Sequence, residues 1–309
     1  MKRTGKKTNN RVQPPIMDKH PAGMLVSVFR GSRVCLHLAY GLLLAVIYPH
    51  LNPSGQHRTL KNWNRQLLTI LNIGILIEGE QPVHGKGGCL IVANHVSWLD
   101  IIVMNAIHPS RFIAKSEVRD WPVIGWLCRR CGTVFIERAS RKDALAVNRS
   151  ISELLGQDVS IGLFPEGTTT EGKQVGPFYS ALIQPAIDAG ARVLPMALRY
   201  QDMDGEAEFA AAFIGDMTLT QSIWNILRCK QQNALVVFTP AMATANANRR
   251  VLAQAAHGAI AQALLSMGSG RQIPLQLEEP DLPIIRIPSL SAYELIVDPL
   301  LNQLPAEDS

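Results

Sequence analysis

The segment Asn94-His-Val-Ser-Trp-Leu-Asp100 carries a histidine and an aspartate five positions apart, where an apolar run meets a helical pattern. Asp100 can accept a hydrogen bond from one imidazole nitrogen of His95 and so fix the tautomer of the ring. The other ring nitrogen is then free to take a proton from a hydroxyl group, as a general base does. A simpler alternative is that Asp100 only caps the following helix and that His95 is an ordinary loop histidine.

No nucleophile motif accompanies this pair, because the sequence contains neither G-x-S-x-G nor H-E-x-x-H. The reacting hydroxyl would therefore belong to the substrate. Cys128 and Cys131 form a C-x-x-C pair, but no second pair and no histidine lies close to it in sequence. We interpret these two cysteines as incidental thiols and expect no metal site.

Three further segments place polar residues at the ends of strand-like apolar runs. Lys115 ends one run, Glu137 and Arg138 follow a second, and Glu166-Gly167-Thr168 follow a third. Gly167 permits close backbone approach to a ligand, and Glu166 can bind a hydroxyl or brace a neighbouring base. For the segment from Glu166 to Thr168, considered by itself, a surface turn is the alternative interpretation. Because ligands collect at the carboxyl ends of parallel strands, such residues at several strand ends favour one shared site.

The elements that must position these residues begin near Gly74, where short β-branched runs alternate with helical stretches. This alternation predicts an α/β fold in which helices flank a mostly parallel central sheet. Strands are expected at 74–79, 89–94, 111–114, 133–137, 159–164, 192–200 and 234–240, and helices at 98–107, 121–130, 141–155, 180–190 and 246–267.

The N-terminal part has a different character. Residues 1–20 are basic and contain proline, and we expect a disordered tail. Residues 34–48 are uncharged but number about 15, fewer than the ~20 needed to cross a bilayer. They could form a short or tilted span, an interfacial helix pair with residues 60–73, or a buried core helix. A signal peptide is not favoured, because no cleavage pattern of small residues follows the segment. We expect membrane association, with the N-terminus cytoplasmic because basic residues precede the segment.

The 309 residues are expected to divide into four parts: the tail 1–20, membrane-associated helices 21–75, an α/β domain 76–245, and a C-terminal helix and tail 246–309. Charged residues make up 18% of the chain, below the usual share of about 25%, which favours membrane contact. The net charge of +5 suits an anionic lipid surface or nucleic acid. Nucleic acid ranks last, because the basic run lacks the interleaved aromatic residues of a stacking platform. Five cysteines without framework spacing favour a reducing, cytosolic compartment.

Four motifs occur in a fixed order along residues 88–200: H-x-x-x-x-D at His95 to Asp100, F-I-E-R at Phe135 to Arg138, F-P-E-G-T at Phe164 to Thr168, and V-L-P at Val193 to Pro195. Together they resemble the glycerolipid acyltransferase family, and most of all the bacterial 1-acyl-glycerol-3-phosphate acyltransferases. The first motif alone is weakly specific, whereas the four in this order are strongly so.

The resemblance implies transfer of a fatty acyl group from a thioester, acyl-CoA or acyl carrier protein, to a lysolipid hydroxyl, with no other cofactor. It also implies a helical element that holds the site at the cytoplasmic face of the bacterial inner membrane, as a peripheral or single-span protein. By the family's roles, His95 is the base and Asp100 orients it, Lys115 and Arg138 contact the acceptor's anionic head group, Glu166, Gly167 and Thr168 help to bind the acceptor, and Pro195 shapes the pocket.

Two departures from the family pattern bear on the acceptor. Thr169 stands where phosphate-using members usually have the arginine of E-G-T-R, and Tyr179 replaces the lysine of P-F-K. Both changes remove a cation, so a lyso-ornithine-type aminolipid stands second to lysophosphatidic acid as the expected acceptor. A thioester or lipid hydrolase with the same pair, and a non-catalytic basic membrane-surface protein, are the alternatives from other classes. The spacing of His95 and Asp100 argues against the last one.

Overall fold

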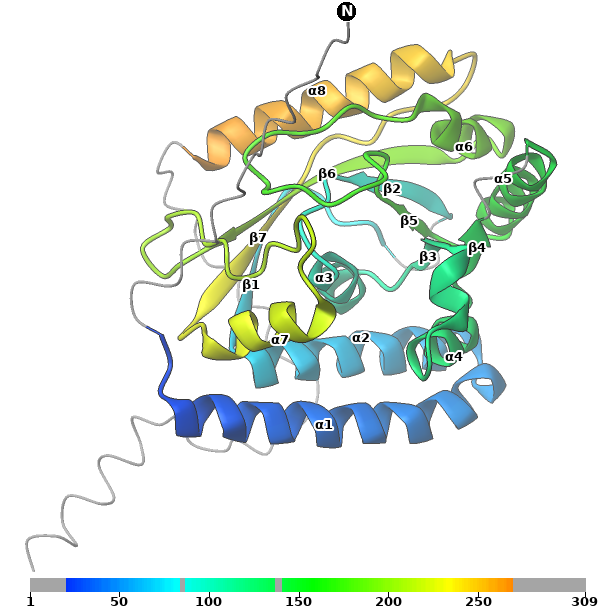
Figure 1. Ribbon diagram of the computed structural model, residues 1–309. Helices are drawn as coiled ribbons and strands as arrows, with labels where there is room; N and C mark the ends of the chain where they lie inside the picture. The colour runs from blue at the N-terminus through cyan, green and yellow to red at the C-terminus, as the bar shows by residue number, and fades with distance from the viewer. Residues whose placement is uncertain (1–20, 84–86, 137–140, 269–309) are drawn as a thin grey trace, which may run out of the picture. The chain divides into compact units, whose positions relative to one another are not determined.

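A seven-stranded sheet organises the computed structural model, which describes residues 21–83, 87–136 and 141–268 (Figure 1). The strand order is β1-β7-β6-β2-β5-β3-β4, and every neighbouring pair is parallel except β6 with β7. The predicted mostly parallel α/β fold is therefore confirmed. The strands are β1 Ile73–Glu78, β2 Cys89–Ala93, β3 Arg111–Lys115, β4 Val134–Ile136, β5 Ile161–Leu163, β6 Arg192–Gln201 and β7 Gln232–Phe238.

Helices cover both faces of this sheet (Figure 1). Apolar residues of α2, α3 and α7 pack on one face, and those of α5, α6 and α8 pack on the other. Since side chains alternate along a strand, Ile91 of β2 joins the first core and Leu90 joins the second. The helices are α1 Met24–Ile47, α2 Pro53–Leu71, α3 Leu99–Ile107, α4 Ile124–Arg130, α5 Arg141–Gly156, α6 Gln184–Asp188, α7 Leu219–Arg228 and α8 Arg249–Met267, with 3-10 turns at Tyr48–His50, Ser116–Asp120 and Ser180–Ile183.

Helix α7 was not predicted from the sequence, although its start carries a recognisable signal. The Thr218 side chain accepts a hydrogen bond from the backbone of Gln221, and the Gln221 side chain bonds back to Thr218, which makes a capping box. The helix buries Ser222, Ile226 and Leu227. Because this helix is short and of mixed polarity, its apolar pattern is less distinct in the sequence than the patterns of the longer segments on either side.

The N-terminal helix α1 packs against the protein through one narrow stripe of small and polar residues. Gly41 permits a close approach, because a Cβ there would lie 2.7 Å from Nε1 of Trp63 in α2. His37 stacks on the same indole, with ring centroids 4.8 Å apart, and its Nε2 donates to the Trp63 carbonyl over 3.0 Å. The buried stripe consists of Ser27, Val34, His37, Gly41 and Ala45.

The opposite face of α1 leaves large apolar side chains exposed, including Leu25 at 86%, Leu36 at 71% and Leu43 at 70%. Within the described residues, Met24–His50 is the one helical segment long and apolar enough to cross a membrane, and 17% of its most apolar window is buried. The buried-core alternative for residues 34–48 is therefore wrong. The proposed interfacial role of 60–73 also loses support, because Leu67, Leu68, Ile70 and Leu71 of α2 are buried inside the protein.

Two of the predicted domain limits can be compared with the structure. The limit between residues 75 and 76 falls inside β1, which pairs with β7 over its whole length. Helix α8, expected in a separate C-terminal part, packs on the same sheet face as α5 and α6. The described residues lie together in one compact unit.

Candidate active site

The turn that carries His95 follows β2 directly and is held by Asn94. The Asn94 amide nitrogen donates to the Leu198 carbonyl, and its oxygen accepts from the Leu198 N–H, both over 2.8 Å. This fully buried side chain thereby replaces a backbone segment in the pairing of β2 with β6. The chain leaves the sheet at a defined point, at the carboxyl edge where a ligand site was expected.

His95 and Asp100 form the predicted pair. Nδ1 of His95 lies 2.8 Å from Oδ2 of Asp100, and the side chains of the two residues are 18% and 0% exposed respectively. The same Oδ2 accepts hydrogen bonds from the backbone N–H groups of Val96, at 2.7 Å, and Ser97, at 3.0 Å. The Asp100 carboxylate therefore orients the imidazole and holds the backbone of the turn that precedes α3, whose N-cap, Trp98, has no side-chain cap hydrogen bond.

Tyr200 supplies a fourth hydrogen bond to this carboxylate, which sequence reasoning missed. Its phenol donates to Oδ1 of Asp100 over 2.9 Å. Complete burial, and then the nearby Asp100 charge, raise the pKa of Tyr200 well above its ordinary value. The phenol therefore remains a donor at any pH at which the protein works. Strand alternation could have indicated this residue, because Tyr200 shares its face of β6 with Leu198 and Met196.

Glu166 braces the His95 turn with both of its carboxylate oxygens. Oε1 accepts from the His95 backbone N–H over 2.9 Å, and Oε2 accepts from the Gly176 N–H over 2.9 Å. The residue is only 5% exposed, and this burial raises the pKa of its carboxyl group despite the two N–H donors. Of the two roles considered for Glu166, bracing is the one that its contacts show.

The imidazole of His95 also lies flat on Phe164, with ring centroids 3.9 Å apart and planes 10° apart. The His95 carbonyl accepts from the Thr170 backbone N–H over 2.8 Å and from its hydroxyl over 3.2 Å. The loop after β5 therefore contacts the histidine through its ring, its N–H and its carbonyl. Such support from several directions holds the ring in one orientation before substrate arrives.

Comparisons with known proteins identify the family of this chain. Residues 74–199, which include His95, Asp100 and Glu166, match the Acyltransferase family. The 1-acyl-sn-glycerol-3-phosphate acyltransferase of Neisseria meningitidis is 41% identical over 186 residues, which cover 60% of this chain and 72% of that protein. The lyso-ornithine lipid O-acyltransferase of Pseudomonas aeruginosa is 34% identical over 217 residues, 70% of this chain and 82% of its own. The chain belongs to the glycerolipid acyltransferase family.

The fold of this acyltransferase also resembles a solved structure. The crystal structure of the 1-acyl-sn-glycerophosphate (LPA) acyltransferase, PlsC, from Thermotoga maritima aligns with a TM-score of 0.57 and 19% identity, over 79% of this chain and all of that one. At this identity the likeness supports the shared architecture. The two proteins therefore share a similar fold.

The other predicted site residues lie around the same edge or outside the described residues. Lys115 ends β3, where its backbone pairs with Ile136 of β4, and Arg138 falls outside the described residues. Gly167 adopts a left-handed φ of 70°, which glycine tolerates best, and Thr168 is exposed. Pro195 is buried in β6 opposite Val92. By strand alternation it lies on the opposite face of β6 from Tyr200.

The two positions that depart from the family pattern make different contacts. The Thr169 hydroxyl donates to the Phe213 carbonyl, so its side chain joins the loop after β6. Tyr179 is 62% exposed, and its backbone N–H donates to the Pro165 carbonyl over 3.0 Å. Thr169 is thus a structural contact, whereas the phenol of Tyr179 extends into solvent.

The segment between β6 and β7 closes one side of the site, which the sequence did not indicate. The Phe213 N–H donates to the Val96 carbonyl over 2.9 Å. Farther on, the Trp98 indole donates to the hydroxyl of Ser222 in α7 over 3.0 Å. Both contacts fall on the His95-to-Asp100 turn. In the part of the chain that the structure describes, no group of three histidine, cysteine or acidic side chains is arranged to hold a metal ion.

Proposed function

We propose that this acyltransferase moves a fatty acyl group from acyl-CoA or acyl carrier protein to the free hydroxyl of a lysophospholipid, with 1-acyl-sn-glycerol-3-phosphate as the first candidate acceptor. The observation that carries the proposal is the 2.8 Å contact between Nδ1 of His95 and buried Asp100. A carboxylate can only accept here, so Nδ1 carries a proton and Nε2 is the nitrogen left to act as base. A relative named for this reaction supports the choice of acceptor.

The proposed reaction needs no covalent intermediate on the protein. Nε2 of His95 takes the acceptor's hydroxyl proton while the oxygen attacks the thioester carbonyl. The tetrahedral intermediate collapses, the carbon–sulfur bond breaks, and the proton on His95 passes to the leaving thiolate. The products are the new ester, phosphatidic acid for this acceptor, and a free thiol. Asp100 stabilises the transient imidazolium, in the way that a buried carboxylate does in other His–Asp pairs.

The acceptor side of the site is assigned from the family roles together with the geometry. Lys115 and Arg138 are proposed to contact the anionic head group, since two cations balance a phosphate monoester. Gly167 and Thr168 are proposed to approach the acceptor from the loop after β5. Glu166 supports that loop through its bonds to His95 and Gly176. Pro195 is proposed to shape the pocket from within β6.

A lyso-ornithine lipid is the second candidate acceptor, and one observation favours it. Thr169, in the position of a frequent family arginine, has its hydroxyl engaged by the Phe213 carbonyl and supplies no charge. Relatives named lyso-ornithine lipid O-acyltransferase align over as much as 80% of this chain, at 32% identity in Rhodobacter capsulatus. An amino-acid head group needs fewer cations than a phosphate monoester.

One assay separates these candidates and the hydrolase alternative. Purified protein in detergent would receive a labelled acyl thioester with lysophosphatidic acid, lyso-ornithine lipid, another lysophospholipid, or no acceptor. We expect label in phosphatidic acid and little thiol release without acceptor. Label only in ornithine lipid would reverse the order of acceptors. Thiol release that does not depend on any lysolipid would favour hydrolysis and contradict the proposal.

We place the protein at the cytoplasmic face of the bacterial inner membrane, attached through α1. The exposed apolar face of α1 continues into an apolar hollow of about 470 Å3, lined by Leu42, Leu43, Val46, Val123 and Trp126. Val123 has φ 66° and ψ −57°, and the Ile124 N–H bonds to the Pro122 carbonyl, which makes a strained γ-turn. This turn leaves Trp121 and Val123 about half exposed beside the hollow, a position suited to tryptophan at a membrane interface.

A further inference from the structure

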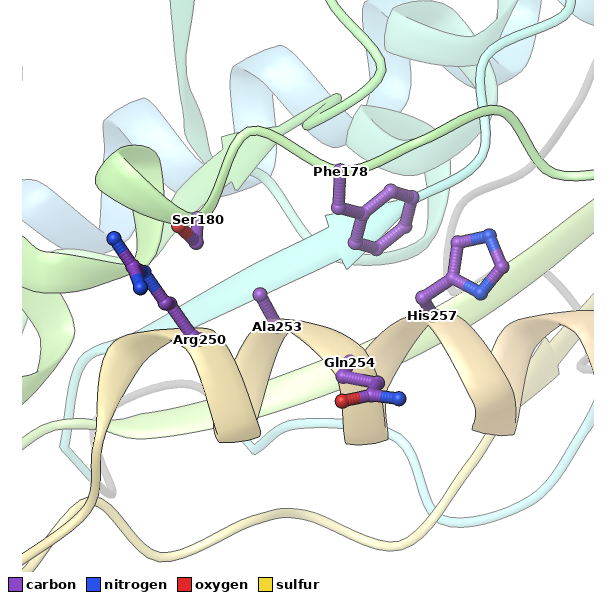
Figure 2. A pocket seen from close by; sticks show the side chains of 6 residues that line it. All are labelled: Phe178, Ser180, Arg250, Ala253, Gln254 and His257. Atoms are coloured by element: carbon purple, nitrogen blue, oxygen red, sulfur yellow. The ribbon is translucent and has the colours of Figure 1, made fainter.

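A pocket of about 330 Å3 lies between α8 and the segment that leads into the 3-10 turn Ser180–Ile183 (Figure 2). Ser180 and Arg250 lie at one end of it, and Phe178 and His257 lie at the other (Figure 2). Ala253 and Gln254 complete the lining from α8. Apart from Phe178, none of these residues belongs to the family motifs in the sequence, and the His95 mechanism uses none of them.

Arg250, at one end of this pocket, forms no ion pair with any of the residues that the structure describes. Arg249 and Arg250 both stand in the first turn of α8, which contains no acidic residue. Cations at a helix N-terminus are unfavourable, because the partial positive charge of the helix dipole lies there as well. The Asn248 side chain caps the Arg250 N–H over 2.8 Å and fixes this end of the helix. An exposed arginine at the positive end of a helix dipole favours an anion.

The other end of the pocket, at His257, is connected to the His95 turn by a series of hydrogen bonds. Nε2 of His257 donates to the Val175 carbonyl over 3.3 Å, and the ring meets Phe178 edge-on at 5.2 Å. The next residue, Gly176, donates to Oε2 of Glu166, whose other oxygen holds the His95 N–H. Hydrogen bonds through Val175, Gly176 and Glu166 therefore connect His257, at this end of the pocket, with the His95 turn.

We propose that this pocket binds a phosphate group of a substrate of the transfer reaction, with Arg250 as its charged ligand and Ser180 as a hydroxyl donor. The guanidinium offers a planar pair of N–H donors that matches phosphate oxygens. Tyr179 replaces a family lysine in sequence, and the neighbouring residue Ser180 lines the same pocket as Arg250, which supplies a cation there. The phosphate can come from the acyl donor's pantetheine carrier or from the acceptor's head group, and this inference rests on the proposed function.

The test compares Arg250→Ala with Arg249→Ala, a matched control in the same helical turn that does not line the pocket. KM is measured separately for acyl-CoA and for lysophosphatidic acid, together with kcat. Binding of coenzyme A and of inorganic pyrophosphate is measured by titration calorimetry. We expect Arg250→Ala to raise KM for one substrate about tenfold to a hundredfold, as the loss of a charge-assisted hydrogen bond does. Arg250→Lys should recover part of the loss, and kcat should stay within about twofold.

Each outcome decides the proposal. A rise in KM for acyl-CoA, with weaker binding of coenzyme A and pyrophosphate, assigns the pocket to the donor's carrier. A rise in KM for lysophosphatidic acid alone assigns it to the acceptor's head group. If Arg250→Ala, Arg249→Ala and wild type have the same KM for acyl-CoA and also the same KM for lysophosphatidic acid, the proposed site is wrong. If the wild type transfers no acyl group, the proposed function fails on its own, and the calorimetric comparison of the variants still tests phosphate binding.

Discussion

The phenol of Tyr200 donates to Oδ1 of Asp100 over 2.9 Å, while the other oxygen of the same carboxylate holds His95. The two residues are 100 positions apart in sequence and both are buried. The Asp100 carboxylate lies out of water and has four hydrogen-bond partners: His95, Tyr200, and the N–H groups of Val96 and Ser97. The His95–Asp100 pair is therefore fixed to strand β6 as well as to its own turn.

Tyr200→Phe should lower kcat about tenfold and leave KM nearly unchanged. Without the phenol, one buried carboxylate oxygen loses its donor, which costs about 1–3 kcal/mol of folding free energy, and Asp100 orients His95 less firmly. Steady-state kinetics and denaturant unfolding measure the two effects. Tyr40→Phe, the same change at an exposed position of α1, serves as the control. A variant with normal kcat would show that Tyr200 has no part in orienting the pair.

His95→Ala should reduce acyl transfer at least 10²-fold, since a positioned base contributes about 10²–10⁴-fold. The melting temperature should stay near that of wild type, because the ring is partly exposed. Asp100→Asn should be nearly as inactive and less stable. Its amide nitrogen cannot accept from the N–H donors of Val96 and Ser97 or from the Tyr200 phenol as the carboxylate does. More than about a tenth of wild-type activity in His95→Ala would contradict the general-base role.

Glu166→Gln should change the pH dependence of stability in a defined direction. Burial raises the pKa of Glu166 above its ordinary value of 4.5, so the folded protein favours the protonated form more than the unfolded chain does. The stability of wild type relative to Glu166→Gln should therefore be greatest below pH 4.5 and decline as pH rises through the higher folded-state pKa. Urea unfolding of both proteins across this range measures the difference. If the free energy of unfolding of wild type relative to Glu166→Gln increased with pH, the prediction would be contradicted.

Replacing Leu25, Leu36 and Leu43 together by Gln should release the protein from the membrane fraction. These side chains lie on the exposed face of α1, so the change removes apolar insertion with little effect on the core. Val251→Gln with Leu265→Gln, at exposed apolar positions of α8, is the matched control. Wild type and control should stay membrane-bound at high salt, which screens only the electrostatic share. Full-length wild type that remains soluble without detergent would argue against membrane attachment.

Thr169→Val should destabilise the loop after β5 by about 0.5–1.5 kcal/mol, the usual net worth of one hydrogen bond, because its hydroxyl bonds the Phe213 carbonyl. Thr169→Arg restores the family cation but loses the same bond. It should therefore lower KM for lysophosphatidic acid relative to lyso-ornithine lipid and also lower the melting temperature. Assays with both acceptors and thermal unfolding test this. An unchanged ratio of the two KM values would show that position 169 does not select the head group.

Features that depend on local pattern could be predicted from the amino-acid sequence. Short apolar, β-branched runs predicted every strand of the described sheet, because strands that helices cover on both faces are apolar on both sides. The His95–Asp100 pair was also predictable, because its two members lie within one turn at a strand end. The uncharged segment 34–48 predicted membrane association for the N-terminal helix, and α1 leaves large apolar side chains exposed.

Only the tertiary structure decided how the pair is held. Tyr200, Glu166 and the segment from Phe213 to Ser222 reach the His95 turn across 71 to 124 positions of sequence. No local pattern records contacts over such distances. The motif around Glu166 indicated a role near the base, but Tyr200, Phe213 and Ser222 carry no such signal in the sequence, and the fold alone brings them to the His95 turn. Burial there leaves each N–H and carboxylate oxygen without water, so each must find a partner within the protein, and those partners make the site rigid.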